Sequence, residues 1–283
     1  TYGDNSLQNK CSCPLSPCEI VDKTLGDKTS KSYAEGCKWK YGKMPLGLGW
    51  LCNDKEGEKG KEDGLCIPPR RKRLYVKDLE TFSDHTTVGL REAFIKCAAV
   101  ETFFAWHEFT KEKEREYKEE KQRNGELGFI DENDQIPKDP DNPQNKIRKN
   151  GEIHEEFKSQ MFYTLADYRD ILFGNNIGIG NDMGKVKSNI DKVFANSSGK
   201  TPTAKKTTPK EWWEKNAKDI WEGMLCALSY DTKTKIKNEE LRKKLIDPKN
   251  SNYMYEKVTF SSDNNTNLSK FTERPPFFRW FQE

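Results

Sequence analysis

Apolar and aromatic residues recur at helical spacing in several segments of the chain, and long polar stretches separate these segments. Residues 88–123 are predicted to form one long helix whose first half is apolar and aromatic and whose second half alternates in charge. In residues 155–173 the apolar positions fall on one stripe of a helix, and Gly174 is placed to end it. A shorter amphipathic helix is predicted for residues 185–195.

Another helix has a clear predicted start at residue 209. Thr208 can cap it, Pro209 suits its first turn, and Glu211 stands three residues after Thr208, as in a capping box. Its apolar stripe consists of Trp213, Ala217, Ile220, Met224 and Leu228. Cys226 lies off that stripe, so the helix is apolar on two sides and is predicted to be central to its bundle.

The remaining segments are shorter or polar. Helical segments are predicted near residues 18–25, at 236–247 and, as the start of a helix, at 274–281. Residues 124–150 are predicted to be a long loop, and residues 196–209 a polar linker. The expected fold class is all-α, with a loop-rich part followed by a helix bundle.

Composition changes this picture in two ways. Only 33% of the 283 residues are apolar, and 34% are charged, yet aromatic residues reach 11% and include seven tryptophans. We therefore expect charged outer faces and a core that packs on aromatic side chains. The net charge of +3 gives no reason to expect a nucleic-acid partner. No stretch approaches the ~18 apolar residues of a membrane span, and the polar N-terminal residues predict no signal peptide, so we expect any membrane anchor to lie outside this sequence.

The eight cysteines indicate disulfide bonds. They stand at positions 11, 13, 18, 37, 52, 66, 97 and 226, and six of them fall within the first 66 residues. An even number crowded into a polar region is typical of a disulfide framework. A zinc site is the alternative, but Cys11, Cys13 and Cys18 do not form paired Cys-x-x-Cys motifs, and no histidine is near them. A bridge between Cys97 and Cys226 would join two helices that are distant in the sequence.

No catalytic, cofactor or metal site is predicted. The three histidines, at positions 85, 107 and 154, are scattered, and no Ser–His–acid arrangement follows from their spacing. The glycines near residue 180 lack nucleotide-loop spacing, and residues 131–142 lack the glycine and glutamate of a calcium loop. We therefore predict that the protein is not an enzyme.

The basic run Arg70-Arg71-Lys72-Arg73 has two interpretations. It could bind sulfated glycans through its positive charge. Since it follows Pro68-Pro69 and lies beside a predicted disulfide, it could equally be structural, with its arginines paired to buried acids.

Several motifs together resemble a known family. In order, they are Trp50-Leu51-Cys52, Gly64 to Arg71, Ala93 to Trp106, Tyr168 to Gly174, Trp212 to Leu228 and Arg274 to Phe281. This series is similar to the Duffy-binding-like adhesion domain of malaria parasites. Residues Cys13 to Val21 and Arg73 to Val76 favour the beta class of that domain in the Plasmodium falciparum erythrocyte membrane protein family, the variant surface antigens of infected red cells.

The resemblance implies a truncated, all-helical Duffy-binding-like domain over residues 1–283. Residues 1–75 would form a loop-rich first subdomain, residues 76–270 a second subdomain built as a helix bundle, and residues 271–283 the start of a third. The implied disulfides are Cys52–Cys66 and Cys97–Cys226. The family's usual cysteine partner of Cys37 is replaced by Tyr75, so Cys37 is expected to pair with Cys11, Cys13 or Cys18.

The resemblance also implies function. Such a domain is displayed on the extracellular face of the infected erythrocyte membrane and mediates adhesion to host endothelium. The favoured partner is the intercellular adhesion molecule; the alternatives are the globular-head complement receptor and a sulfated glycan. Relatives that bind the intercellular adhesion molecule use a surface near the third subdomain, so the receptor-binding residues of this chain stay unassigned.

Overall fold

Helices make up nearly all of the regular structure in the described part of the chain. The structure is a computed structural model. It describes residues 14–27, 30–41, 50–52, 66–124, 141–175, 183–196, 207–249, 251–260 and 266–283. Cys11, Cys13 and most of the predicted linker at 196–209 therefore lie outside the described residues.

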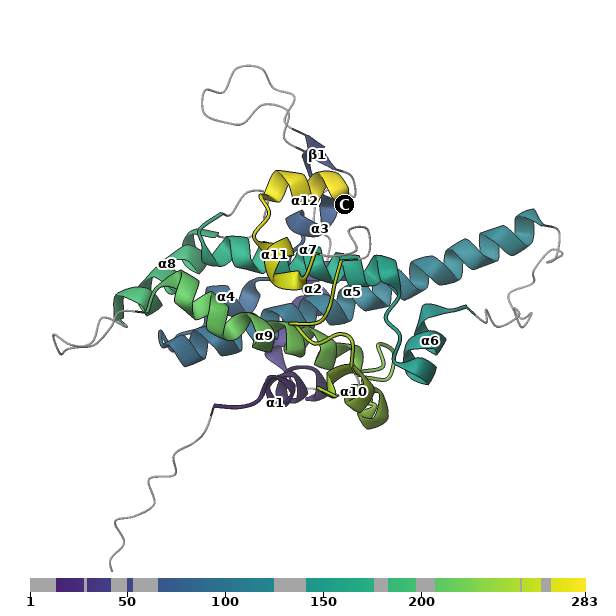
Figure 1. The fold of residues 1–283 in the computed structure, drawn as a ribbon, viewed down its shortest axis with the longest axis horizontal. Coiled ribbons are helices and arrows are strands. Elements are labelled where there is room, and N and C mark those ends of the chain that lie inside the picture. The colour runs from purple at the N-terminus through teal and green to yellow at the C-terminus, as the bar shows by residue number, and fades with distance from the viewer. Residues whose placement is uncertain are drawn as a thin grey trace, which may run out of the picture.

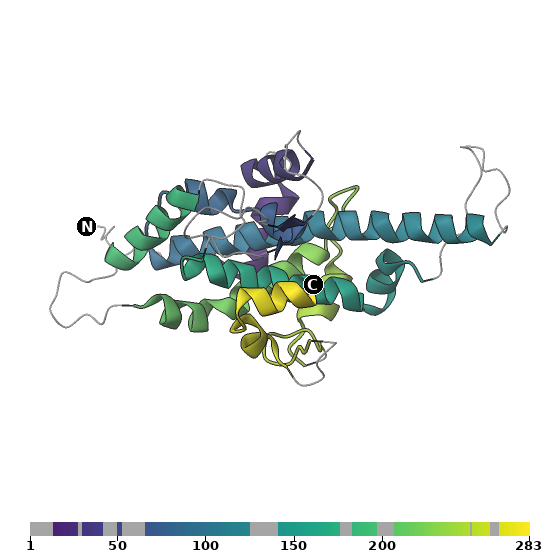
Figure 2. The same cartoon turned by 90° about the horizontal axis from the view of Figure 1, so that it is seen from above.

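Three long helices form the bundle: α5 (Thr87–Arg123), α7 (Glu155–Leu172) and α9 (Pro209–Leu228) lie side by side (Figures 1 and 2). The shorter helices around them are α1 (Pro17–Val21), the π-helix η1 (Asp22–Gly26), α2 (Lys31–Tyr41), α3 (Pro69–Lys72), α4 (Lys77–Thr81), α6 (Pro143–Asn150), α8 (Met183–Asn196), α10 (Glu239–Ile246), α11 (Leu268–Thr272) and α12 (Pro276–Gln282). Two short strands, β1 (Leu51–Cys52) and β2 (Cys66–Ile67), pair antiparallel. The predicted all-α class is confirmed.

The core is built on aromatic side chains, as the composition predicts. The largest fully buried side chains include four tryptophans, Trp106, Trp212, Trp221 and Trp280. Phe94 of α5 packs against Trp212 of α9 with 5.4 Å between ring centroids, and Trp106 packs against Phe157 of α7 at 4.8 Å. Each contact joins helices that are far apart in the sequence, so aromatic packing fixes the order of the bundle.

The charged second half of α5 extends beyond the bundle (Figure 2). Its side chains are mostly exposed and form short-range ion pairs within the helix, such as Lys113–Glu116 at 3.0 Å. Pairs of this kind add a few tenths of a kcal/mol each to a solvated helix. The alternating charges of this half of α5 therefore lie on a solvated helix face.

The prediction of a continuous loop at 124–150 is wrong in its last part, where α6 begins at Pro143. Asn142 caps this helix by accepting a hydrogen bond from the Gln144 backbone nitrogen at 2.9 Å, and Gly151 ends it with φ at 71°. An asparagine before a proline is a local signal for the start of a helix, and a glycine is a signal for its end. The prediction gave more weight to the polar composition of the segment than to these two signals.

The disulfide of the bundle joins Cys18 of α1 to Cys226 of α9, with 5.5 Å between their Cα atoms. The predicted bridge between Cys97 and Cys226 is therefore wrong. Cys97 carries a fully buried free thiol on the side of α5 that faces Asp78 and Leu79 of α4, and burial raises its pKa. Cys97 and Cys226 lie on helices that face each other, but their side chains project toward different neighbours. The side of α9 that carries Cys226 packs against α1.

Two other cysteine predictions have different outcomes. Cys37 is a free, partly buried thiol, so its predicted pairing with Cys11, Cys13 or Cys18 is wrong; Cys18 is already bonded to Cys226. Cys66 is disulfide-bonded, and its backbone lies directly opposite Cys52 in the β1–β2 pair. A bridge between Cys52 and Cys66 stays a prediction.

Gly223 permits the close approach of α9 to α5. A Cβ atom at this position would lie 2.8 Å from Cγ2 of Ile95. We expect Gly223→Ala to lower the free energy of unfolding by about 1–3 kcal/mol, because Ile95 and the helix backbones would have to move apart. Urea unfolding measures the change. Gly184→Ala is the control: residue 184 is an exposed helical position on α8, and there the substitution should be neutral or slightly stabilising.

Candidate functional site

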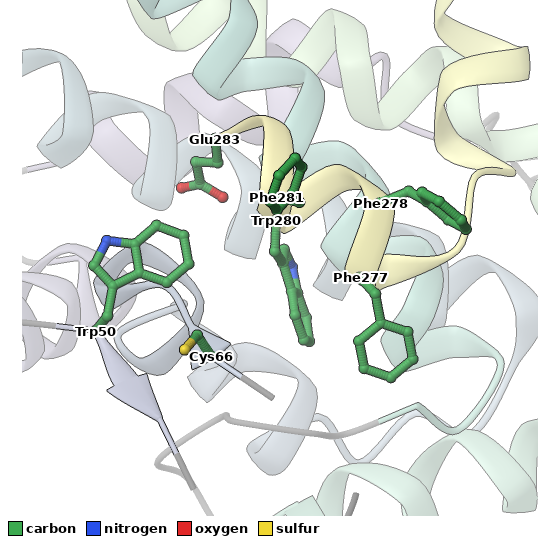
Figure 3. A pocket seen from close by; sticks show the side chains of 7 residues that line it. All are labelled: Trp50, Cys66, Phe277, Phe278, Trp280, Phe281 and Glu283. Atoms are coloured by element: carbon green, nitrogen blue, oxygen red, sulfur yellow. The ribbon is translucent and has the colours of Figure 1, made fainter. Parts of the chain in front are cut away.

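Exposed aromatic side chains gather on α12 and beside it. Phe281 is 93% exposed and Phe278 67%, and Phe277 and Trp50 are each exposed by more than a third. Figure 3 shows Trp50 and Cys66 on one side of a pocket and α12 on the other, and the pocket encloses about 520 Å³. We call these four exposed side chains the aromatic surface. Contiguous exposed apolar patches on proteins commonly mark interaction sites.

The helix α12 presents this surface because its two faces differ sharply. Pro275 and Pro276 fix its start, with Pro276 in its first turn. Successive helical residues point about 100° apart, so Arg279 and Trp280 turn inward and are almost fully buried, whereas Phe278 and Phe281 turn outward. The three phenylalanines of the aromatic surface therefore lie on a helix that the core holds in place.

A cluster of charged side chains lies beneath α12. It consists of Arg70, Arg71, Asp167, Asp170 and Arg279, and we call it the arginine–aspartate cluster. Arg70 Nη1 lies 2.5 Å from Asp167 Oδ2, and Arg71 Nη1 lies 3.4 Å from Asp167 Oδ1. Arg279 forms an ion pair with Asp170.

Further hydrogen bonds tie the cluster to the chain around it. Arg71 Nη1 donates to the Asp167 carbonyl oxygen at 3.0 Å, and Arg70 also pairs with Glu283 after the last turn of α12 at 2.7 Å. The cluster thus joins α3, α7 and α12.

Arg70 and Arg71 of the basic run therefore have a structural role, since buried or half-buried carboxylates hold their guanidinium groups; glycan binding by the run Arg70, Arg71, Lys72 and Arg73 stays a prediction. Arg71 and Lys72 are buried, and Arg70 and Arg73 are only partly exposed. The Arg73 carbonyl oxygen accepts hydrogen bonds from Trp39 Nε1 at 2.8 Å and from Lys40 Nζ at 2.9 Å.

The two aspartates of the cluster differ in acidity. Burial opposes ionisation of Asp167, but the charges of Arg70, Arg71 and Arg279 outweigh it, so the pKa of Asp167 lies below its usual range. Burial raises the pKa of Asp170 to about 6, even though Arg279 favours its charged form. Asp167 is therefore the constant counter-charge of the cluster, and Asp170 is the group that titrates.

We expect Asp170 to make stability fall as pH rises from about 4 to about 6. Its pKa is about 6 in the folded protein and close to 4 in an unfolded chain. The folded state therefore binds the proton more tightly, and this contribution is complete below pH 4 and lost as pH passes 6. It amounts to at most about 3 kcal/mol.

Carbon-13 NMR titration of the Asp170 carboxyl measures its pKa, and urea unfolding of Asp170→Asn between pH 4 and 7 isolates its effect on stability. The variant should lack this component of the pH dependence. A carboxyl that titrates below pH 4 in the folded protein would contradict the prediction.

His107 lies on α5 with Nδ1 3.0 Å from Thr232 Oγ1, and burial together with Lys111 lowers its pKa. Within the described ranges, one group of side chains is close enough to share a metal ion, namely Cys18, Glu222 and Cys226. Its two cysteines are joined to each other in the disulfide, so they are not free to act as thiolate ligands.

Sequence reasoning missed the aromatic surface. It predicted a helix start at 274–281 but assigned no surface to it. The available signal was the spacing of Phe277, Phe278 and Phe281 around Arg279 and Trp280: five large side chains in one short helix cannot all face inward. Nothing in the sequence around Trp50 indicated that it would lie beside this helix.

The described residues form a disulfide-bonded, all-helical module with an exposed aromatic surface. No helix in the described part is both long and apolar enough to cross a membrane. A family model, the Duffy binding domain, matches residues 64–271. The chain belongs to the Duffy binding domain family. It is thus an extracellular, non-enzymatic adhesion module that binds host surface receptors or glycans. No curated protein matches the chain.

Proposed function

We propose that this domain mediates cytoadhesion of infected erythrocytes to host endothelium through the intercellular adhesion molecule. The match to the Duffy binding domain over residues 64–271 carries the adhesive function. The motifs from Cys13 to Val21 and from Arg73 to Val76 support the finer assignment to the beta class of the Plasmodium falciparum erythrocyte membrane protein family. In that setting the domain lies on the extracellular face of the infected cell.

Adhesion of this kind requires surfaces that are complementary in shape and charge, and it involves no chemical reaction. In protein interfaces a few buried aromatic or arginine anchors supply most of the free energy. The scaffold suits this role because the Cys18–Cys226 disulfide and the arginine–aspartate cluster hold its helices from two sides. Rigid surfaces lose little entropy on binding and therefore keep more of the contact energy.

We propose further that the chain is organised as residues 1–75, 76–270 and 271–283, the last being the start of a third subdomain. The aromatic surface on α12 supports this division, since Phe278 and Phe281 offer an apolar seat for a following helical unit. A third subdomain that packs on this apolar surface would lie next to the bundle. The receptor contacts that relatives make near their third subdomain would then also lie next to the bundle.

A receptor panel tests the function. The domain, extended through its third subdomain, is passed over immobilised intercellular adhesion molecule, the globular-head complement receptor and heparin. We expect saturable binding to the first. Binding only to the complement receptor or only to heparin would replace the proposed partner by one of the alternatives, and binding to none would contradict an adhesive role for this variant.

Phe281→Ser in the extended domain tests the seat. It should weaken receptor binding several-fold, because the third subdomain would lose its apolar support. Val88→Ser is the matched control, as Val88 is an exposed apolar residue at the start of α5. Equal binding by both variants would argue against the seat while leaving the adhesive function intact.

A further inference from the structure

The loop between α9 and α10, residues 231–237, holds a backbone conformation that few residues adopt. Lys235 has φ at 59°, and among the described residues it is the one non-glycine residue with positive φ. A side chain with a Cβ atom is disfavoured in the left-handed region, because the Cβ atom comes too close to the following carbonyl oxygen. Such conformations persist where the surroundings fix them, and they concentrate at functional sites.

Hydrogen bonds within the loop fix its shape. The Asp231 carboxylate accepts hydrogen bonds from the backbone nitrogens of Lys233 at 3.0 Å and Thr234 at 2.6 Å. The Asp231 backbone nitrogen donates to the Ile236 carbonyl oxygen at 3.0 Å, and the Lys235 nitrogen donates to the Asp231 carbonyl oxygen at 2.8 Å. The turn is therefore closed on both sides of Lys235.

Contacts from three other helices hold the loop against the bundle. The Lys235 ammonium group lies 3.5 Å from the ring centroid of Tyr33 on α2, a cation–π contact. Thr232 bonds to His107 of α5 at 3.0 Å, and Arg148 of α6 forms an ion pair with Asp231. The loop is thus a preformed surface.

The outer side of this loop combines one apolar side chain with positive charge. Ile236 is 68% exposed, and Lys233 of the same loop is exposed as well. Arg148 neutralises Asp231. In the part of the chain that the structure describes, neither Lys233 nor Lys235 has a carboxylate partner.

We propose that the α9–α10 loop is a receptor-contact surface, in which Ile236 enters an apolar pocket of a host surface protein and the exposed Lys233 faces a carboxylate at the rim of that pocket. The inference rests on the proposed adhesive function. A loop already in its bound shape loses little entropy on binding, and its charges speed encounter with an acidic partner.

Adhesion of coated beads tests this surface. Beads that carry the 283-residue chain are perfused over cultured host endothelial cells, and adherent beads are counted. We expect Ile236→Asp to lower adhesion at least tenfold and Lys233→Glu several-fold. Val88→Asp, at an exposed apolar position on α5, should leave adhesion unchanged, and Ile236→Val should retain most of it. Circular dichroism and melting temperature check that each variant folds.

The outcomes separate this inference from the function on which it rests. Adhesion of wild-type beads that is unchanged in both Ile236→Asp and Lys233→Glu would overturn the contact surface and leave the adhesive function standing. Lack of adhesion by wild-type beads that carry the 283-residue chain would overturn the contact surface, whereas the adhesive function is decided by the receptor panel on the extended domain. A loss that is equal in Ile236→Asp and Val88→Asp would also overturn the inference, because it would reflect surface charge in general.

Discussion

Removal of the disulfide between Cys18 and Cys226 is expected to lower the free energy of unfolding by about 5 kcal/mol. The bridge spans a sequence separation of 208 residues, and a loop of about that length gives this value in the chain-entropy estimate. Whole domains are stable by only about 5–15 kcal/mol. The double variant Cys18→Ser/Cys226→Ala, which leaves neither of these thiols unpaired, should therefore unfold at much lower urea concentration than the wild type.

Cys97→Ala is the control for this prediction. Cys97 is a buried free thiol, so its replacement removes one sulfur atom from a packed site and should cost only about 1–2 kcal/mol. Peptide mapping without reduction provides the direct assay. A Cys18 peptide linked to a Cys226 peptide, with the Cys97 peptide alone, is the expected result; a Cys97 peptide linked to Cys226 would contradict the structure.

Asp167→Asn is expected to destabilise the protein by about 3–5 kcal/mol. Asp167 is fully buried and lies within 4 Å of the guanidinium groups of Arg70, Arg71 and Arg279. An asparagine keeps the volume of the side chain but not its negative charge. The buried guanidinium groups would then lack a counter-charge. Hydrogen exchange should show the largest loss of protection in α12. That helix is held to the cluster by Arg279 and by Glu283, which pairs with Arg70.

Asp191→Asn serves as the comparison. Asp191 forms a 2.6 Å ion pair with Lys187, but both side chains are more than half exposed. Exposed pairs contribute between nothing and about 1 kcal/mol. An effect of Asp167→Asn no larger than that of Asp191→Asn would show that the cluster is not a structural junction.

The long helices could be predicted because their signals are local. The capping box at Thr208 and Glu211 forms as expected, with the Glu211 nitrogen 3.2 Å from Thr208 Oγ1. The same motif occurs at Ser16 and Glu19 and starts α1, although the sequence analysis did not use it. Short helices such as α4 and α11 were missed because one or two turns carry too little periodicity to be distinguished from a loop.

The cysteine pairs could not be predicted in the same way. Eight cysteines allow many pairings, and the choice depends on which segments of the folded chain face one another. Cys97 and Cys226 lie on helices that do pack together, which is consistent with a bridge between them. The rotation of each helix about its own axis, however, points the two side chains in different directions. The roles of Arg70 and Arg71 depended likewise on Asp167, about 100 residues away in the sequence.

The sequence by itself determined the helical class, the central position of the helix at 209–228, the aromatic core and, through its ordered motifs, the family. These properties follow from spacing and composition, which a short window of residues contains. Only the tertiary structure decided that Cys18 bonds to Cys226, that Arg71 is buried beneath α12, and that Phe278 and Ile236 face outward. Each of these depends on distances between segments remote in the chain, and packing of the whole bundle sets those distances.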